Sequence, residues 1–312
     1  MSRVLVTGGA GFIGSNVARM LLDRGDEVVV YDDLSTGREE LVDPRATLVV
    51  AGLADTAALD RALAGCDAAM HFAASSIIAG SFSDPLGYVE NNVVNGTRLV
   101  EAMRRAGTGQ LVFSSSAAVY GEPRVVPVPE DHPKDPIQLY GASKLAFEVV
   151  LGGYAQAFGF DSVSLRYFNA YGPADLQEPV TRAVPAWVRA GLRGEPLRMY
   201  WGGRQRRDYV FVEDIAEAHL RVLGLPGRRV YNIGTGDGVL MLDVVAALGT
   251  ALGRGLEVED AGERPGDPMR LVADTSAIER DLGWKPRIGL AQGLERTVAW
   301  YRANRELWDR GR

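Results

Sequence analysis

Short apolar runs alternate with helix-like segments through the first half of the chain. The runs at 3–7, 27–31, 47–50, 68–72, 110–114 and 162–167 are rich in β-branched and other apolar residues and predict strands. Between them, apolar residues recur at helical spacing over 12–24, 56–64, 84–106 and 140–158. Buried strands separated by helices are typical of a parallel sheet covered on both faces. The pattern therefore predicts an α/β, doubly wound sheet.

The second half has a less regular pattern. It predicts helices over 181–191, 212–223, 241–252 and 290–302, and a late strand over 229–233. Gly, Pro and Arg are concentrated between 172 and 203, which indicates a change of domain. We predict an N-terminal domain over 1–172, with a later segment at about 206–235 returning to it. A smaller α/β substrate domain is expected over 173–312.

Composition narrows the class of protein. The 312 residues are 46% hydrophobic and 24% charged, and 34 basic against 40 acidic residues give a net charge of −6. This balance is that of a globular protein and argues against nonspecific nucleic-acid binding. Cys66 is the only cysteine and the three histidines are far apart, so we expect no disulfide and no metal site. No apolar run reaches the roughly 18 residues of a membrane helix and no leader is evident, so a cytoplasmic location is expected.

The segment TGGAGFIGS, residues 7–15, follows the first predicted strand and opens the first helix. Gly8 permits a tight turn, Gly11 lets a diphosphate approach the backbone, and Gly14 allows close packing of the helix. The free N–H groups of the helix N-terminus favour phosphate binding. Asp32 lies 18 residues after Gly14, at the end of the second strand, where a carboxylate accepts from ribose hydroxyls. These features predict a Rossmann-type fold that binds NAD rather than NADP.

Candidate chemistry lies in YGASK, residues 140–144, and SSSAAVYG, residues 114–121. Tyr140 and Lys144 are four residues apart at the start of a helix, so their side chains share one face. The Lys144 ammonium is expected to favour the phenolate and lower the pKa of Tyr140. Ser116 follows a predicted strand at the edge of the sheet where ligands bind, so its hydroxyl is expected to bind a substrate oxygen.

Together with HFAA (71–74) and LRYFNAYGP (165–173), these motifs resemble the extended short-chain dehydrogenase/reductase family, and within it the UDP-glucose 4-epimerases. The resemblance extends from Arg3 to about Trp300. It implies that Ser116, Tyr140 and Lys144 are catalytic and that NAD is the cofactor. The implied cofactor-binding residues are Gly8, Gly11, Phe12, Ile13, Gly14, Asp32, Leu53, Phe72, Ala73, Ala74, Asn91, Ser114, Tyr140, Lys144 and Tyr167.

The resemblance also implies a reaction and a substrate. Tyr140 would take the proton from the sugar 4-hydroxyl, Ser116 would hold the 4-oxygen, and a transient 4-keto sugar would be reduced on its other face. The substrate would be a nucleotide sugar, most similar to UDP-glucose or UDP-galactose. Its implied contacts are Ser116, Asn169, Arg182, Arg207, Arg264 and Asp267. A homodimer built on 84–106 and 140–158, with Val150, Tyr154 and Phe158 in its interface, is also implied.

Several positions depart from the family pattern. Gly52 stands where an Asp commonly contacts adenine, Ser76 where some members have a phosphate-binding Lys, and Arg182 where an Asn precedes the apolar-Pro pair. Leu271 replaces a bulky aromatic near the sugar and leaves room for an N-acetyl group. UDP-N-acetylhexosamines and other nucleotide sugars therefore remain alternative substrates.

Other reactions of related proteins are also alternatives. Ala117 and Ala118 follow Ser116 where dehydratases carry an acidic pair, which disfavours dehydration. The residues after Pro173 include no Arg for a uronate carboxylate. A ketoreductase and, last, a noncatalytic NAD-binding sensor are the remaining alternatives. A sensor would be expected to lack the Tyr or the Lys.

Overall fold

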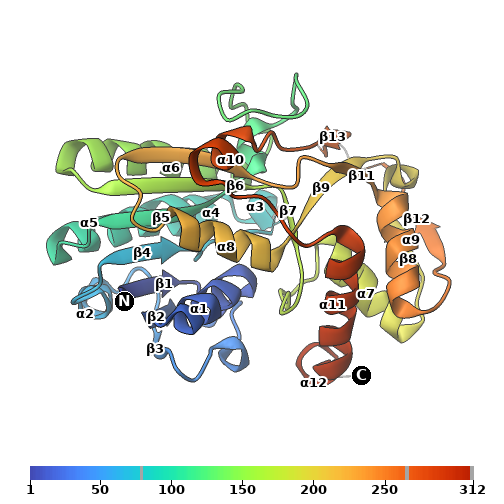
Figure 1. The fold of residues 1–312 in the computed structure, drawn as a ribbon, viewed down its shortest axis with the longest axis horizontal. Coiled ribbons are helices and arrows are strands. Elements are labelled where there is room, and N and C mark those ends of the chain that lie inside the picture. The colour runs from blue at the N-terminus through green and yellow to red at the C-terminus, as the bar shows by residue number, and fades with distance from the viewer. Residues whose placement is uncertain (78–79, 264–266, 310–312) are drawn as a thin grey trace.

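The computed structural model describes residues 1–77, 80–263 and 267–309 (Figure 1). Its main sheet has seven strands, all paired in parallel, in the order β10-β6-β5-β4-β1-β2-β3. They are β1 (Arg3–Thr7), β2 (Glu27–Asp32), β3 (Thr47–Val50), β4 (Ala68–His71), β5 (Gln110–Ser116), β6 (Asp161–Tyr167) and β10 (Arg228–Ile233). The strand order reverses between β1 and β4. Ligands of doubly wound sheets bind outside the carboxyl ends of the strands at such a switch point.

Helices cover both faces of this sheet, as the sequence predicts (Figure 1). Successive strand residues face opposite ways, so Val4 and Val6 pack toward one set of helices and Leu5 toward the other. The first set is α1 (Phe12–Arg24), α8 (Val212–Val222) and α10 (Ser276–Leu282). The second set is α2 (Thr56–Leu63), α5 (Gly96–Ala106) and α6 (Leu139–Phe158). Among the described residues, no helix combines the length and apolar character that a membrane span needs.

The second half of the chain builds a smaller α/β layer, on the right in Figure 1. Its main sheet joins β7 (Asn169–Tyr171), β9 (Arg206–Phe211), β11 (Gly238–Leu240) and β13 (Arg270–Leu271), while β8 (Leu197–Met199) pairs with β12 (Val258–Asp260). The helices are α7 (Ala183–Arg193), α9 (Met241–Leu252), α11 (Leu290–Ala303) and α12 (Arg305–Trp308). A separate apolar core around Trp187, Leu248 and Leu294 holds them together. Short helical turns complete the fold: α3 (Gly80–Ser83), η1 (Glu39–Leu41), η3 (Ala117–Tyr120) and η4 (Trp201–Gly203).

Most predicted elements differ from the observed ones by one or two residues at their ends, and two differences affect the site. The helix expected over 84–106 is divided into α4 (Pro85–Val89), the π-helical segment η2 (Glu90–Asn95) and α5. Asp84 caps α4, and its side chain accepts from the Gly87 N–H at 3.0 Å. The strand expected to end at Ser114 continues to Ser116, because Ser115 pairs with Arg166 and Ser116 with Tyr167 of β6. Ser116 is therefore the last strand residue, at the carboxyl edge of the sheet.

Candidate active site

The glycine-rich turn between β1 and α1 is packed too closely for side chains. Gly8 has a φ of +70°, and a Cβ there would lie 2.5 Å from the Ala73 nitrogen. A Cβ on Gly14 would lie 2.3 Å from the Gly8 oxygen. Gly11 caps α1 without a side-chain hydrogen bond, and the first helical turn carries no acidic residue. The N–H groups at the start of α1 therefore face a cradle of bare backbone that suits a diphosphate.

Asp32 ends β2 beside this turn. Its carboxylate accepts from the Ala10 N–H at 3.0 Å and from the Leu34 N–H at 2.9 Å, one bond to each oxygen. Burial raises the pKa of Asp32, and these two N–H donors oppose that rise. Each oxygen keeps acceptor capacity for a ribose hydroxyl. Arg38 also reaches the cavity edge, where its N–H donates to the Ala10 oxygen at 2.9 Å.

The three predicted catalytic side chains meet where β5 ends and α6 begins. The Ser116 hydroxyl accepts from the Ala118 N–H at 3.2 Å, and it lies close enough to the Tyr140 phenol to act on its pKa. The Lys144 ammonium donates to the Ser114 carbonyl at 2.9 Å and lies 4.9 Å from the centre of the Phe113 ring. It lies 6.0 Å from the centre of the Tyr140 ring. Strand and helix thus bring together a hydroxyl, a phenol and an amine from separate parts of the sequence.

The electrostatics of this group differ from the sequence-based expectation. Burial raises the pKa of Tyr140, while the Ser116 hydroxyl and the Arg182 charge oppose that rise. Burial also lowers the pKa of Lys144 to about 7, although the Glu148 charge acts to raise it. The expectation that the Lys144 ammonium lowers the pKa of Tyr140 is therefore wrong for this arrangement. The Lys144 amine donates to the Ser114 carbonyl, and its lowered pKa favours loss of its proton.

A cavity of about 330 Å³ joins the glycine-rich turn to the catalytic group. Every residue that the sequence assigns to the cofactor lines it: Gly8, Gly11, Phe12, Ile13, Gly14, Asp32, Leu53, Phe72, Ala73, Ala74, Asn91, Ser114, Tyr140, Lys144 and Tyr167. The glycine cradle and the Asp32 carboxylate beside it fit the diphosphate and a ribose of NAD. Among the predicted substrate residues, Arg182 also lines this cavity.

Comparison with known proteins identifies the family. The sequence model of the NAD dependent epimerase/dehydratase family matches residues 4–234, well over half of the chain. The chain belongs to this family. It is 38% identical over 298 residues to a UDP-glucose 4-epimerase of Corynebacterium glutamicum, with 91% of each chain covered.

Solved structures of the family superimpose on the chain over nearly its whole length. The UDP-glucose 4-epimerase of Thermus thermophilus, in complex with NAD, gives a TM-score of 0.90 at 38% identity and covers 97% of this chain and 99% of its own. A dTDP-glucose 4,6-dehydratase from Streptomyces venezuelae, with NAD bound, gives 0.92 at 35% identity over 98% and 99%. Overall shape therefore does not separate the two reactions, and the side chains of the site must do so.

Three further predicted substrate residues, Asn169, Arg207 and Asp267, lie on or next to the smaller sheet. Asn169 begins β7 and pairs with Tyr209 of β9, the strand that also carries Arg207. The Asp267 carboxylate accepts from the Arg207 guanidinium at 2.5 Å and from the Gln205 amide at 2.7 Å. Asn169 Oδ1 is buried and has no hydrogen-bond partner among the described residues. Arg264, also predicted to bind substrate, lies outside the described residues.

The residues at which this chain departs from the family pattern make contacts of their own. The Gly52 carbonyl accepts from the Tyr31 hydroxyl at 2.8 Å, so this backbone is fixed without a side chain. The Ser76 hydroxyl accepts from the Gln177 amide at 2.9 Å, which links the loop after β4 to the second half of the chain. Leu271 is half-buried against an apolar cluster that includes Tyr120 and Phe168.

A buried ion pair behind the catalytic helix was not predicted from the sequence. Glu148 lies one turn beyond Lys144 on α6, is 5% exposed, and binds the Arg166 guanidinium of β6 at 2.6 Å. Its carboxylate also accepts from the Ser115 hydroxyl at 2.5 Å, and Arg166 donates to the Tyr120 hydroxyl at 2.9 Å. This network fixes α6 against the strand that ends in Ser116. In the sequence, the signal for this pair is Glu148 itself, a charged residue on the buried face of a helix.

Asn92 was missed for a different reason. It is 2% exposed in η2, and its side chain accepts from the Ser75 N–H at 2.8 Å and donates to the Ser143 hydroxyl at 2.9 Å. It therefore ties the loop after β4 to α6, next to Lys144. Only the π-helical turn brings Asn92 to this position, and the sequence gives no signal for such a turn.

Proposed function

We propose that the chain is an NAD-dependent 4-epimerase of a nucleotide sugar, with UDP-glucose and UDP-galactose as the substrate pair. The meeting of Ser116 with Tyr140 and Lys144, of which the latter two line the cavity that starts at the glycine-rich turn, carries this proposal. The family and the names of the relatives, UDP-glucose 4-epimerase among them, support it.

Each catalytic residue has a role that its contacts support. Tyr140 exchanges the proton of the sugar 4-hydroxyl, and the Ser116 hydroxyl beside it favours loss of the phenol proton. Ser116 holds the same sugar oxygen through both oxidation states at C4. Lys144, fixed by the Ser114 carbonyl, binds a cofactor ribose hydroxyl. When bound, NAD supplies the redox chemistry at C4.

The residues after Ser116 favour epimerisation over dehydration. Eliminating water from a sugar requires an acid close to the leaving hydroxyl. Ala117 and Ala118 open η3 directly after Ser116, and Ala117 is 3% exposed inside an apolar cluster. Neither side chain can donate a proton. A ketoreductase would consume a reduced cofactor, whereas an epimerase needs no external redox partner.

The smaller sheet is suited to the nucleotide end of the substrate. The Arg207 guanidinium and the Asp267 carboxylate lie 2.5 Å apart. The guanidinium can donate to a diphosphate, and the carboxylate can accept from a ribose hydroxyl. Asn169 adds a buried oxygen that lacks a partner among the described residues, and a ligand hydroxyl would satisfy it. Because Leu271 is small and half-buried, UDP-N-acetylhexosamines are the second substrate class to test.

We also propose a homodimer through α5 and α6. Val149 and Phe158 of α6 are 62% and 54% exposed, while Val150 and Tyr154 are half-buried. Between the helices lies a hollow of about 340 Å³ lined by Val93, Val94, Tyr154 and polar neighbours. Apolar surface of this kind on helices suits a two-fold interface.

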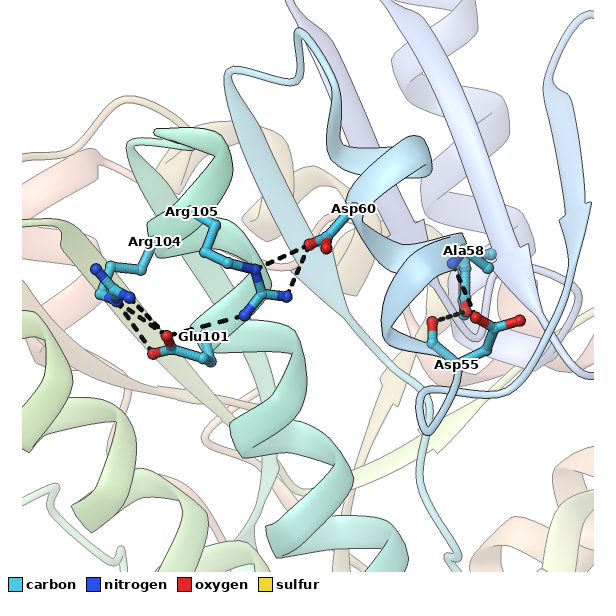
Figure 2. A network of polar contacts seen from close by, with 7 residues as sticks. Asp55, Ala58, Asp60, Glu101, Arg104 and Arg105 are labelled. Carbon is cyan, nitrogen blue, oxygen red and sulfur yellow. Dashed lines mark hydrogen bonds and ion pairs between the residues drawn. The ribbon is translucent and has the colours of Figure 1, made fainter.

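A charged network borders this surface (Figure 2). Arg105 of α5 donates to Asp60 of α2 at 2.7 Å, and Arg104 pairs with Glu101 at 2.7 Å. Arg104 also lies over the Phe158 ring, with 5.4 Å between guanidinium carbon and ring centre. These residues would form the polar rim around the apolar contact.

The two-domain division at about residue 172 and the cytoplasmic location stay predictions.

An NMR time course with UDP-galactose and NAD tests the proposed function. We expect UDP-glucose to appear and settle at a constant ratio, without net formation of reduced cofactor. The Tyr140→Phe variant is the matched control, and it should bind NAD yet convert nothing. A 4-keto-6-deoxy sugar as product would contradict the proposal. Parallel samples with UDP-N-acetylglucosamine and UDP-N-acetylgalactosamine define the substrate range.

A further inference from the structure

Arg182 brings a positive charge from the second half of the chain to the start of α1. It is the residue before α7, and it lines the same cavity as Gly11, Phe12 and Ile13. The guanidinium carbon lies 5.4 Å from the centre of the Phe12 ring. Phe12 is the first residue of α1. Arg182 thus contacts the first residue of the helix whose N–H groups the glycine-rich turn leaves open.

A buried carboxylate fixes this guanidinium. Asp175 is 1% exposed and accepts from Arg182 Nε at 2.7 Å and from its Nη2. The backbone of Asp175 is itself held, because its carbonyl oxygen accepts from the Tyr301 hydroxyl and from Arg189 at 3.5 Å. Arg182 Nη1 makes no hydrogen bond to the described residues. A preorganised guanidinium with one free amino group is a built anion site.

Two other cationic side chains line the cavity. Among the described lining residues, the cationic side chains are those of Arg38, Lys144 and Arg182. Lys144 donates to the Ser114 carbonyl at the catalytic end. Arg38 follows the Asp32 loop, and its backbone is bound to Ala10. Arg182 is the cavity cation whose guanidinium contacts the first residue of α1, where the cradle fits two phosphates.

We propose that Arg182 binds the diphosphate of NAD rather than the nucleotide sugar. This rests on the proposed function for the identity of the cofactor. It reassigns a residue that the sequence places with the substrate. It also makes cofactor binding depend on the smaller α/β layer, because Asp175, Arg189 and Tyr301 hold the guanidinium in place.

Binding measurements on the full chain, freed of bound nucleotide, test this without turnover. ADP-ribose carries the diphosphate of NAD without the nicotinamide, and UDP reports on the substrate end. In the Arg182→Gln variant we expect ADP-ribose and NAD to bind about 10- to 100-fold more weakly, the loss of one charge-assisted hydrogen bond. Adenosine, which has no phosphate, and UDP should bind as to the unaltered chain. Calorimetric titration measures all four.

Controls separate this role from a loss of folding. Arg182→Gln leaves the Asp175 carboxylate buried without its partner, so the double variant with Asp175→Asn removes both charges together. It should show the same selective loss for ADP-ribose. Arg221→Gln removes an exposed arginine from α8 and should change nothing.

Three results would overturn the proposal: unchanged ADP-ribose affinity, a larger loss for UDP than for ADP-ribose, or equal losses for both. Failure of the chain to epimerise UDP-galactose, with the selective ADP-ribose loss still present, would count against the proposed function alone.

Discussion

Replacing Lys144 by Met should stabilise the protein while it abolishes catalysis. Lys144 is 3% exposed, and burial lowers its pKa from 10.5 to about 7. At about 1.4 kcal/mol per pH unit, this difference corresponds to a cost of roughly 5 kcal/mol at pH 6. The Lys144→Met variant loses the hydrogen bond to the Ser114 carbonyl, which reduces its gain by about 1.5–3 kcal/mol. We expect Lys144→Met to be more stable by roughly 2–3 kcal/mol at pH 6.

The pH dependence gives the sharper form of this prediction. Between pH 7 and 10.5 the unfolded chain keeps the Lys144 proton and the folded chain releases it, so stability rises with pH. From pH 6 to pH 9 this group alone should add about 3 kcal/mol to the unfolding free energy of the unaltered chain. The Lys144→Met variant lacks this rise.

The advantage of the variant should therefore shrink and disappear between these pH values. Thermal unfolding of the nucleotide-free chain and its variant at pH 6, 7, 8 and 9 measures the difference. A gap of about 5–10 °C at pH 6 is expected. The Lys285→Met variant is the control, because Lys285 is 65% exposed and pairs with Glu279 at the surface. A difference between Lys144→Met and the unaltered chain that stays constant with pH would show that Lys144 keeps its ordinary pKa in the folded chain.

Three further predictions concern catalysis, folding and assembly. Tyr140→Phe should lower turnover at least about 10²- to 10⁴-fold, since it removes the proton-exchanging group, while NAD affinity measured by calorimetry stays unchanged. Glu148→Gln should cost about 3–5 kcal/mol in urea unfolding, because it leaves the buried Arg166 unpaired, and adding Arg166→Met should recover most of that loss. Val149→Glu together with Phe158→Glu should convert a dimer to a monomer in sedimentation velocity, and a dimer that persists would contradict the proposed interface.

The fold was accessible from the sequence because local and global signals agree. Alternating apolar runs and amphipathic helices match the parallel sheet, and helices 12–24 and 241–252 are found at the predicted bounds. The end of β5 is an exception, because the predicted strand stops at Ser114 and the observed one at Ser116. Ser114 and Ser115 look like a polar end to a strand, but both are buried and pair with β6.

The cofactor half of the site was also predictable, since it depends on one contiguous motif and on strand ends. The electrostatics of the catalytic residues were not predictable from the sequence. Whether Lys144 faces Tyr140 or the Ser114 carbonyl depends on helix placement, which Glu148 and Arg166 determine across 18 residues of sequence. The pairing of Arg182 with Asp175 likewise depends on how the loop before α7 folds over α1. Such contacts arise from packing and leave no periodic signal.

UDP-galactose carrying deuterium at C4 tests whether the chain oxidises and reduces the same carbon of a nucleotide sugar. The product is examined by NMR and mass spectrometry. We expect UDP-glucose that retains deuterium at C4, without exchange with solvent and without net reduced cofactor. Loss of the label to water, or its transfer to another carbon of the sugar, would contradict the proposed function.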